Sequence, residues 1–161
     1  MVFIAVKPHL YQGMLSRLQD QGRRYGDKLW VSIMAGVVLT DLTAAINSVT
    51  RDLASRIVRS IPNTPVKVRK GSIGVTLSEG CSSQDREVVL TLFSSVGRCV
   101  EIPERLQNSF AAMAGSGPAY IYQVITLTCQ PLPFPHYDIR ISTNKKWAKI
   151  LTDIKPIDNQ V

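Results

Sequence analysis

Residues 55–80 read S-R-I-V-R-S-I-P-N-T-P-V-K-V-R-K-G-S-I-G-V-T-L-S-E-G. The β-branched run at residues 56–61 predicts a strand, which ends where two prolines remove ladder donors. A second strand is predicted at residues 72–78. Between the two strands, Asn63 and Thr64 lie at a strand's carboxyl end, where open α/β sheets place groups that contact ligands. From spacing alone, the favoured interpretation of these residues is a proline-framed turn in which Asn63 bonds its own backbone.

Strand and helix patterns alternate along the rest of the chain. Further strands are predicted at residues 2–6, 30–35 and 99–102. Helices are predicted to start at Pro8, at a Thr40 cap, at a Ser82/Asp85 capping box and at Pro103-Glu104. Their expected apolar faces are Tyr11, Leu15 and Leu18; Leu42, Ala45, Ile46 and Val49; Val89, Leu92, Phe93 and Val96; and Leu106, Phe110 and Met113.

This alternation predicts an α/β fold with a mainly parallel sheet that is covered by helices on both faces. In such a fold a ligand binds outside the carboxyl ends of the strands. We therefore expect a ligand site next to Lys7-Pro8, Ala35-Gly36 and Asn63-Thr64.

The glycine-rich stretch G-S-G-P-A-Y, residues 115–120, begins like a dinucleotide-binding turn but departs from it. No strand precedes it, and Pro118 has no amide for a phosphate. It predicts a helix break and restart, with Ser116 or Gly117 as the cap and a helical face of Ile121, Val124, Ile125 and Thr128. Residues 106–137 carry no formal charge, which predicts a buried helix there and no membrane span.

Composition is ordinary for one globular domain: 161 residues, 45% hydrophobic and 19% charged. The net charge of +7 would suit an anionic partner, but the basic residues are scattered and not interleaved with aromatic ones. The three cysteines have no metal-ligand spacing, and their odd number suits a reducing compartment, cytoplasmic or mitochondrial. No zinc or other metal site is expected, and His9 and His136 are interpreted as surface or loop residues.

Five segments in order resemble pyrroline-5-carboxylate reductase: A-V-K-P at residues 5–8, M-A-G-V at 34–37, R-I-V-R-S-I-P-N-T-P at 56–65, F-S-S-V-G-R at 93–98, and G-S-G-P-A-Y at 115–120. The resemblance covers about residues 2–128. Each segment alone is weak, whereas the ordered set is specific.

The resemblance implies an enzyme that reduces 1-pyrroline-5-carboxylate to L-proline with NADPH or NADH, the last step of proline biosynthesis. It implies cofactor contacts at Ala5, Val6, Lys7 and Pro8, at Ile33, Met34 and Ala35, and at Glu104. Asn63 and Thr64 are the candidates that would line the imine site. The chemistry is hydride delivery to a C=N carbon, for which a protein mainly positions donor and acceptor.

The resemblance also implies what this chain lacks: the family's glycine-rich strand-turn, and most of its C-terminal helical dimerisation domain. We expect the C-terminal part of a Rossmann-like, dinucleotide-binding domain over residues 1–112. The first dimerisation helix is expected at 113–129, and an unrelated, poorly ordered tail at 130–161. A truncated form that is weakly active or inactive is the corresponding functional expectation.

Two other functions are kept as alternatives. In the first alternative, the chain is a non-catalytic fragment that associates with full-length reductase subunits through the helix at residues 117–128, as a homo- or hetero-oligomer. In the second alternative, it is a basic nucleic-acid-binding protein, and its binding to oligonucleotides would then depend steeply on salt. The primary expectation includes neither a nucleic-acid nor a membrane partner.

Overall fold

A computed structural model describes residues 1–20, 27–50 and 55–128. The described residues up to Leu127 belong to one compact unit. The predicted tail at 130–161 lies outside the described residues. In chain order the elements are β1 (Val2–Ile4), η1 (Pro8–Leu10), α1 (Tyr11–Asp20), β2 (Leu29–Ser32), α2 (Leu39–Thr50), β3 (Arg56–Ile61), η2 (Thr64–Val68), β4 (Gly71–Leu77), α3 (Ser83–Ser94), β5 (Gly97–Glu101), α4 (Glu104–Phe110), η3 (Ala111–Gly115) and α5 (Gly117–Thr128).

One five-stranded sheet organises the described residues, with the strands in the order β1-β2-β3-β4-β5. Strands β1, β2 and β3 are parallel, β4 is antiparallel to β3, and β5 is parallel to β4. The predicted α/β fold with a mainly parallel sheet is therefore confirmed. The strand predicted from the β-branched run coincides with β3.

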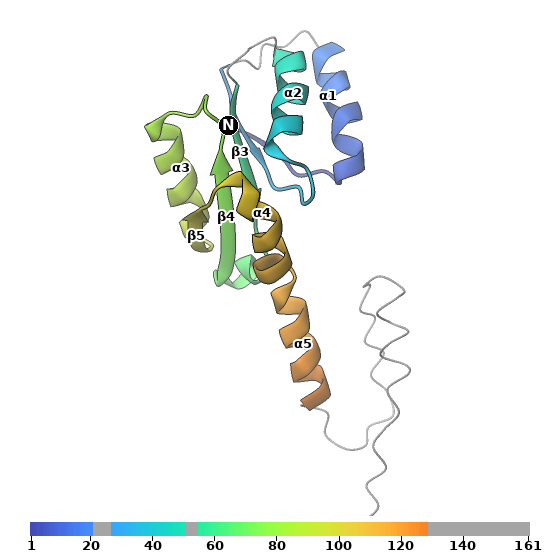
Figure 1. Ribbon diagram of the computed structural model, residues 1–161, viewed down its shortest axis with the longest axis vertical. Helices are drawn as coiled ribbons and strands as arrows, with labels where there is room; N and C mark the ends of the chain where they lie inside the picture. Colours follow the sequence, from blue (N-terminus) through green and yellow to red (C-terminus); the bar gives the residue numbers. More distant parts are fainter. Residues whose placement is uncertain (21–26, 51–54, 129–161) are drawn as a thin grey trace, which may run out of the picture. The chain divides into compact units, whose positions relative to one another are not determined.

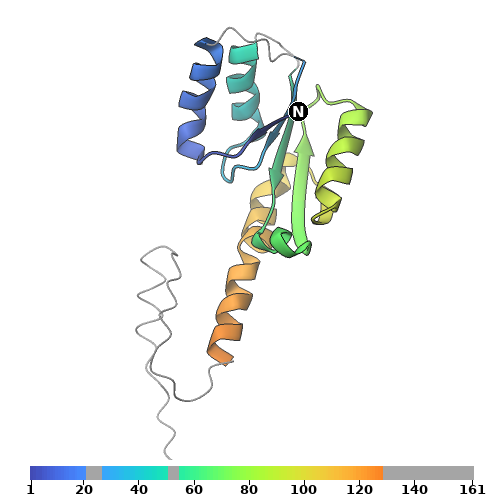
Figure 2. The same ribbon diagram turned by 180° about the vertical axis from the view of Figure 1, so that it is seen from behind.

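Helices cover both faces of this sheet (Figures 1 and 2). Successive residues of a strand point to opposite faces. In β3, Ile57 packs into a core with residues of α1 and α2, whereas Val58 packs into a second core with residues of α3. Both side chains are fully buried. The chain thus has two cores, one on each face of the sheet.

Helix α4 lies on the same face as α1 and α2, but it does not bury the residues that the pattern predicts. Leu106 is 41% exposed and Met113 is 79% exposed, whereas Gln107 is fully buried. The Gln107 amide Nε2 donates to Thr76 Oγ1 of β4 at 2.9 Å. A polar contact to the sheet therefore sets the rotation of α4, and the expected apolar stripe is wrong for two of its three members.

The starts of two helices differ in how well the sequence predicts them. The Ser82/Asp85 capping box of α3 is confirmed, with each side chain bonded to the other residue's backbone N–H. Burial raises the pKa of Asp85, but hydrogen bonds from Ser82 and the nearby Arg56 outweigh it and hold the pKa below its ordinary value. The Thr40 cap is wrong, because α2 begins at Leu39 and the Glu104 side chain accepts from the Leu39 N–H.

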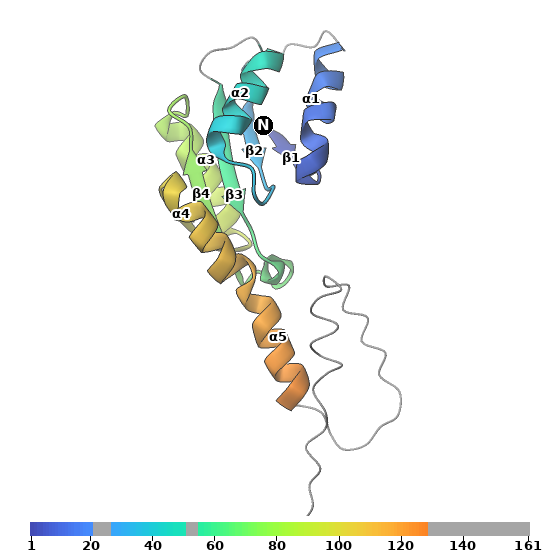
Figure 3. The same cartoon turned by 45° about the vertical axis from the view of Figure 1, so that its right-hand side comes forward.

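The predicted helix break and restart at the glycine-rich stretch is confirmed. The π-helical turn η3, which follows α4, ends at Gly115, and α5 starts at Gly117 after Ser116 (Figure 3). The buried helix expected beyond it is wrong for this chain, because Ile121, Val124 and Ile125 are at least half exposed. Within the described ranges no helix is both long and apolar enough to cross a bilayer.

Candidate functional site

The carboxyl ends of the three parallel strands meet at one edge of the sheet. Ile4 of β1 pairs with Ser32 of β2, and Ser32 pairs with Arg59 of β3. The segments that follow these strands are residues 5–8, 33–35 and 63–64, which we call together the carboxyl edge. The structure thus brings together three of the segments singled out from the sequence, as expected for parallel strands.

The first two segments of the carboxyl edge are held by backbone contacts and by one core side chain. The Ile33 N–H donates to Ile4 O at 3.1 Å, which extends the β1–β2 ladder by one residue. Met34 is only 2% exposed, and its N–H donates to Ser32 Oγ. Ala5, Lys7, Pro8, Ile33 and Ala35 are exposed, and Val6 is half-buried. Met34 therefore anchors its loop, while its neighbours are accessible to a ligand.

Asn63 uses both ends of its amide to join distant parts of the chain. Its Oδ1 accepts from the Ser72 N–H at the start of β4, and its Nδ2 donates to Ala114 O in η3, both at 2.9 Å. The local turn in which Asn63 bonds its own backbone is therefore not formed. Thr64 is exposed at the first position of η2, so its hydroxyl is the more accessible of the two imine-site candidates.

Pro118 explains why a main-chain carbonyl is available to Asn63, because proline has no N–H to donate to Ala114 O four residues back. In η3 the Ser116 N–H donates to Ala111 O, five residues back. Such a turn shifts the helical hydrogen-bond ladder by one residue, and π-turns are frequent at functional sites. Ala114 O bonds the Asn63 side chain. The glycine-rich stretch is thereby fixed next to the carboxyl end of β3.

Glu104 lies at the centre of a polar network beneath α4. Its Oε1 accepts from the Leu39 N–H at 3.0 Å and pairs with Arg59 Nη1. Arg59 Nη2 also donates to Asn108 Oδ1 at 3.0 Å, and the Arg59 side chain is 1% exposed. We call Arg59, Glu104, Asn108 and the Leu39 N–H the Arg59 network. It ties β3, α4 and the start of α2 together.

Sequence reasoning named Glu104 but missed Arg59. The available signal was an arginine on the same face of the predicted strand as Ile57 and Ile61, where an apolar residue is expected. A second signal was the spacing of Glu104 and Asn108, which places two oxygen-bearing side chains on one helix face. Neither signal identifies the partner, because the partners are 45 and 49 residues apart.

One carboxylate oxygen of the Arg59 network has no partner among the described residues. Glu104 Oε2 is buried and accepts no hydrogen bond there. Buried acceptors in folded proteins are almost always satisfied by protein, water or ligand. Glu104 Oε2 therefore keeps a capacity to accept a hydrogen bond that no described residue uses.

Other chemical groups of the described residues are poorly suited to catalysis. Burial raises the pKa of the Cys99 thiol to about 11, and burial also raises that of Cys81. Neither is thus a ready thiolate nucleophile. No cluster of three or more potential metal ligands occurs in the described ranges.

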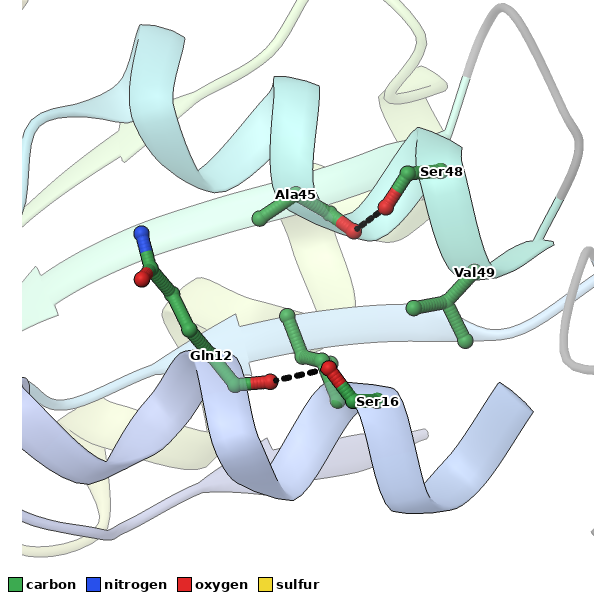
Figure 4. A pocket seen from close by; sticks show the side chains of 6 residues that line it. Gln12, Ser16, Ala45, Ser48 and Val49 are labelled. Atoms are coloured by element: carbon green, nitrogen blue, oxygen red, sulfur yellow. Dashed lines mark hydrogen bonds between the residues drawn. The ribbon is translucent and has the colours of Figure 1, made fainter. Parts of the chain in front are cut away.

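Two surface pockets lie outside the predicted segments. One of about 230 Å³ separates α1 from α2 and is lined by Gln12, Ser16 and Ser48, among others (Figure 4). The Ser16 and Ser48 hydroxyls donate to carbonyls of their own helices, Gln12 O and Ala45 O. The other, of about 490 Å³, is lined in part by the Arg86–Glu101 ion pair. The Ser16 and Ser48 hydroxyls and the Arg86–Glu101 pair are thus already bonded within the protein.

A mainly parallel sheet, helices on both faces and candidate residues at the carboxyl edge define a Rossmann-like α/β protein. No protein-family profile matches the chain. The chain is 34% identical over 124 residues to the pyrroline-5-carboxylate reductase of Methanosarcina acetivorans and 35% identical over 124 residues to that of Aquifex aeolicus. Each alignment covers 77% of this chain and 43% of the relative.

Solved structures give the same result. A Plasmodium falciparum pyrroline carboxylate reductase with NADP bound matches 78% of this chain with a TM-score of 0.67 and 30% identity, and 47% of that protein is covered. A Coxiella burnetii pyrroline-5-carboxylate reductase matches with a TM-score of 0.68 and 27% identity, over 94% of this chain and 52% of that protein. The predicted resemblance is confirmed: this chain is homologous to part of the pyrroline-5-carboxylate reductases, and it spans less than half the length of the two curated relatives.

Proposed function

We propose that this chain forms the nicotinamide side of a pyrroline-5-carboxylate reductase site, where NADPH or NADH reduces 1-pyrroline-5-carboxylate to L-proline. The observation that carries the proposal is the buried, unpartnered Glu104 Oε2, in a network that also bonds the start of α2 just beyond the 33–35 segment. A nicotinamide carboxamide has an NH₂ group that such an oxygen can accept from. The unpartnered Glu104 carboxylate oxygen is therefore a suitable acceptor for the carboxamide of the cofactor.

Each part of the carboxyl edge has a proposed role. Residues 5–8 and 33–35 hold the dinucleotide mainly through backbone groups, and Glu104 Oε2 orients the carboxamide. Thr64 provides the hydroxyl nearest the imine, whereas Asn63 fixes the position of Thr64 through its bonds to β4 and η3. When bound, the cofactor supplies a hydride for the C=N carbon. The chain's contribution is to hold the two reactants close and correctly oriented.

We expect the chain by itself to bind dinucleotide weakly. A helix that starts after a glycine-rich turn supplies the backbone N–H groups that usually bind the pyrophosphate. The G-x-G-x-x-G pattern is absent from residues 1–161, and its nearest approximation, residues 115–120, forms the π-turn and the start of α5. Weak activity or none is the expected result for this chain without another subunit.

The test is a titration of ¹⁵N-labelled protein with NADPH, which detects millimolar binding. Amide shifts are expected at residues 5–7 and 33–35, and Glu104→Ala should reduce them. Loss of NADPH absorbance with the imine supplied then measures turnover, and Thr64→Val should lower it relative to Thr64→Ser. Shifts confined to other surfaces, or saturation with no shift at the carboxyl edge, would refute the assignment.

A second function is favoured by the surface of α5. Tyr120, Ile121, Tyr122, Val124 and Ile125 are each 50–59% exposed, an apolar surface typical of a protein–protein contact. On this alternative the chain associates with full-length reductase subunits through α5 and is not itself a catalyst. Co-purification that survives dilution supports it, and Ile125→Asp should abolish binding. The matched control is Val88→Asp on α3, where an equally apolar residue is 44% exposed.

A further inference from the structure

The Arg59 network contains a cation in a place where stability alone does not explain it. The Arg59 side chain is 1% exposed, whereas its partner Glu104 is 32% exposed. Taking a guanidinium out of water is costly, and replacing a buried ion pair with apolar residues is often neutral or stabilising. In addition, Arg59 Nε is buried without a hydrogen-bond partner among the described residues. Arg59 therefore leaves its Nε–H unsatisfied, while Nη1 and Nη2 each bond a side-chain oxygen of α4.

The bonds from Nη1 and Nη2 fix the orientation of the Glu104 carboxylate. Nη2 is bonded to Asn108 Oδ1, which fixes the plane of the guanidinium against α4. Nη1 pairs with Glu104 Oε1, the same oxygen that accepts from the Leu39 N–H. With Oε1 held by two donors from two elements, the carboxylate cannot rotate freely, and Oε2 is presented at one fixed place.

We propose that Arg59 is a positioning residue for the nicotinamide contact, acting through Glu104. The proposal rests on the function proposed above. Arg59 fixes the carboxylate so that Oε2 faces the ligand, and it holds Oε1 on the first N–H of α2, just beyond residues 33–38. The Arg59 guanidinium thereby holds Glu104 Oε2, the acceptor for the carboxamide NH₂, at a fixed position relative to residues 33–38. Lysine cannot replace it, because an ammonium lacks the planar fork that reaches two acceptors in fixed directions.

The experiment compares two ligands that differ only in the nicotinamide, NADPH and 2′-phospho-ADP-ribose. For the wild-type chain, the dissociation constant of 2′-phospho-ADP-ribose divided by that of NADPH measures what the nicotinamide contributes. Arg59→Met keeps an apolar side chain in the core and removes the fork. We expect it to lower that ratio about tenfold, the loss of one charge-assisted contact, with the affinity for 2′-phospho-ADP-ribose unchanged. Arg59→Lys should restore stability but not the ratio.

The matched control is Arg56→Met. Arg56 is in the same strand and pairs with Asp85 at 2.9 Å, but its side chain is 36% exposed and its partner is in α3. This variant should lose stability without a change in the ratio. If Arg59→Met folds poorly, the double variant Arg59→Met/Glu104→Gln removes both charges together and should again show the lowered ratio. An unchanged ratio in both variants, or an equal loss for both ligands, would overturn the proposal.

A wild-type chain that binds both ligands equally would refute the nicotinamide assignment, and with it the proposed function. Hydrogen exchange in the free chain still decides whether Arg59 positions Glu104. The Leu39 N–H should exchange at least tenfold faster in Arg59→Met than in the wild type or Arg56→Met. Unchanged exchange at Leu39 would show that Glu104 keeps its place without Arg59.

Discussion

The substitution Asn63→Ala tests whether Asn63, a candidate for lining the imine site, stabilises the fold or binds the ligand. The substitution removes two hydrogen bonds, from Ser72 N–H to Oδ1 and from Nδ2 to Ala114 O, both at 2.9 Å. It leaves a donor at the start of β4 and an acceptor in η3 without partners. Because Asn63 and Ser72 are only half-buried, the lower part of the 1–3 kcal/mol range applies to each orphaned group.

The two losses together should lower the free energy of unfolding by about 2–4 kcal/mol. For a unit of this size each kcal/mol corresponds to roughly 3–5 °C in Tm, so a decrease of about 10 °C is expected in a thermal melt. Asn63→Asp keeps an acceptor for the Ser72 N–H but loses the donor to Ala114, and it should show about half the effect. Thr64→Ala, at the exposed neighbour, should leave Tm unchanged.

One pair of results would show that the Asn63 side chain contacts the ligand and does not brace the fold. If Asn63→Ala melts within about 2 °C of the wild type and yet weakens binding of the imine or the dinucleotide, then the amide faces the ligand. Hydrogen exchange at the Ser72 N–H gives an independent check, because this amide should lose protection in Asn63→Ala and retain it in Asn63→Asp.

Three further outcomes follow from the described residues. A Cβ on Gly97 would lie 2.2 Å from Gly71 O, so Gly97→Ala should cost about 2 kcal/mol or more in a urea melt, whereas Gly13→Ala in α1 meets no atom within 4 Å and should stabilise by up to about 1 kcal/mol. The pKa of Asp85 is lowered from 3.8, so the stabilisation by its carboxylate is present above about pH 4 and is lost as the pH falls through the folded-state pKa. The difference in unfolding free energy between the wild type and Asp85→Asn should therefore shrink between pH 6 and pH 2.5. A difference that stays constant over this range would contradict the prediction. With a pKa of about 11, Cys99 should react with a disulfide reagent at pH 8 about a hundredfold more slowly than free cysteine in a variant that keeps only this thiol, and equal rates would show that the site is open.

Local patterns in the sequence predicted the elements well where one residue type dominates the local physics. The β-branched run became β3 with its predicted bounds, and the Ser82/Asp85 capping box formed as expected. Both signals act over a few residues, and both depend on backbone sterics or on a hydrogen bond within one helical turn. The meeting of three segments at the carboxyl edge also followed, because parallel strands end at the same side of a sheet.

The same kind of pattern was wrong where a distant partner decides the outcome. Thr40 is a suitable cap by type, yet Glu104, 65 residues from Leu39, bonds the first N–H of α2. Apolar spacing assigned Leu106 to the core, but the contact between Gln107 and Thr76 sets the rotation of α4. The apolar face of α5 was expected to be buried, and within the described part of one chain it is exposed.

The sequence by itself determined the strands, most helices, the resemblance to a reductase family and the segments of the carboxyl edge. Only the tertiary structure decided which atoms of those segments are available to a ligand. Asn63 has both ends of its amide bonded within the fold, while Glu104 keeps a buried oxygen without a partner among the described residues. The reason is that hydrophobic periodicity specifies which face of an element is covered, whereas hydrogen bonds between residues 45 to 65 positions apart exist only after the elements have packed.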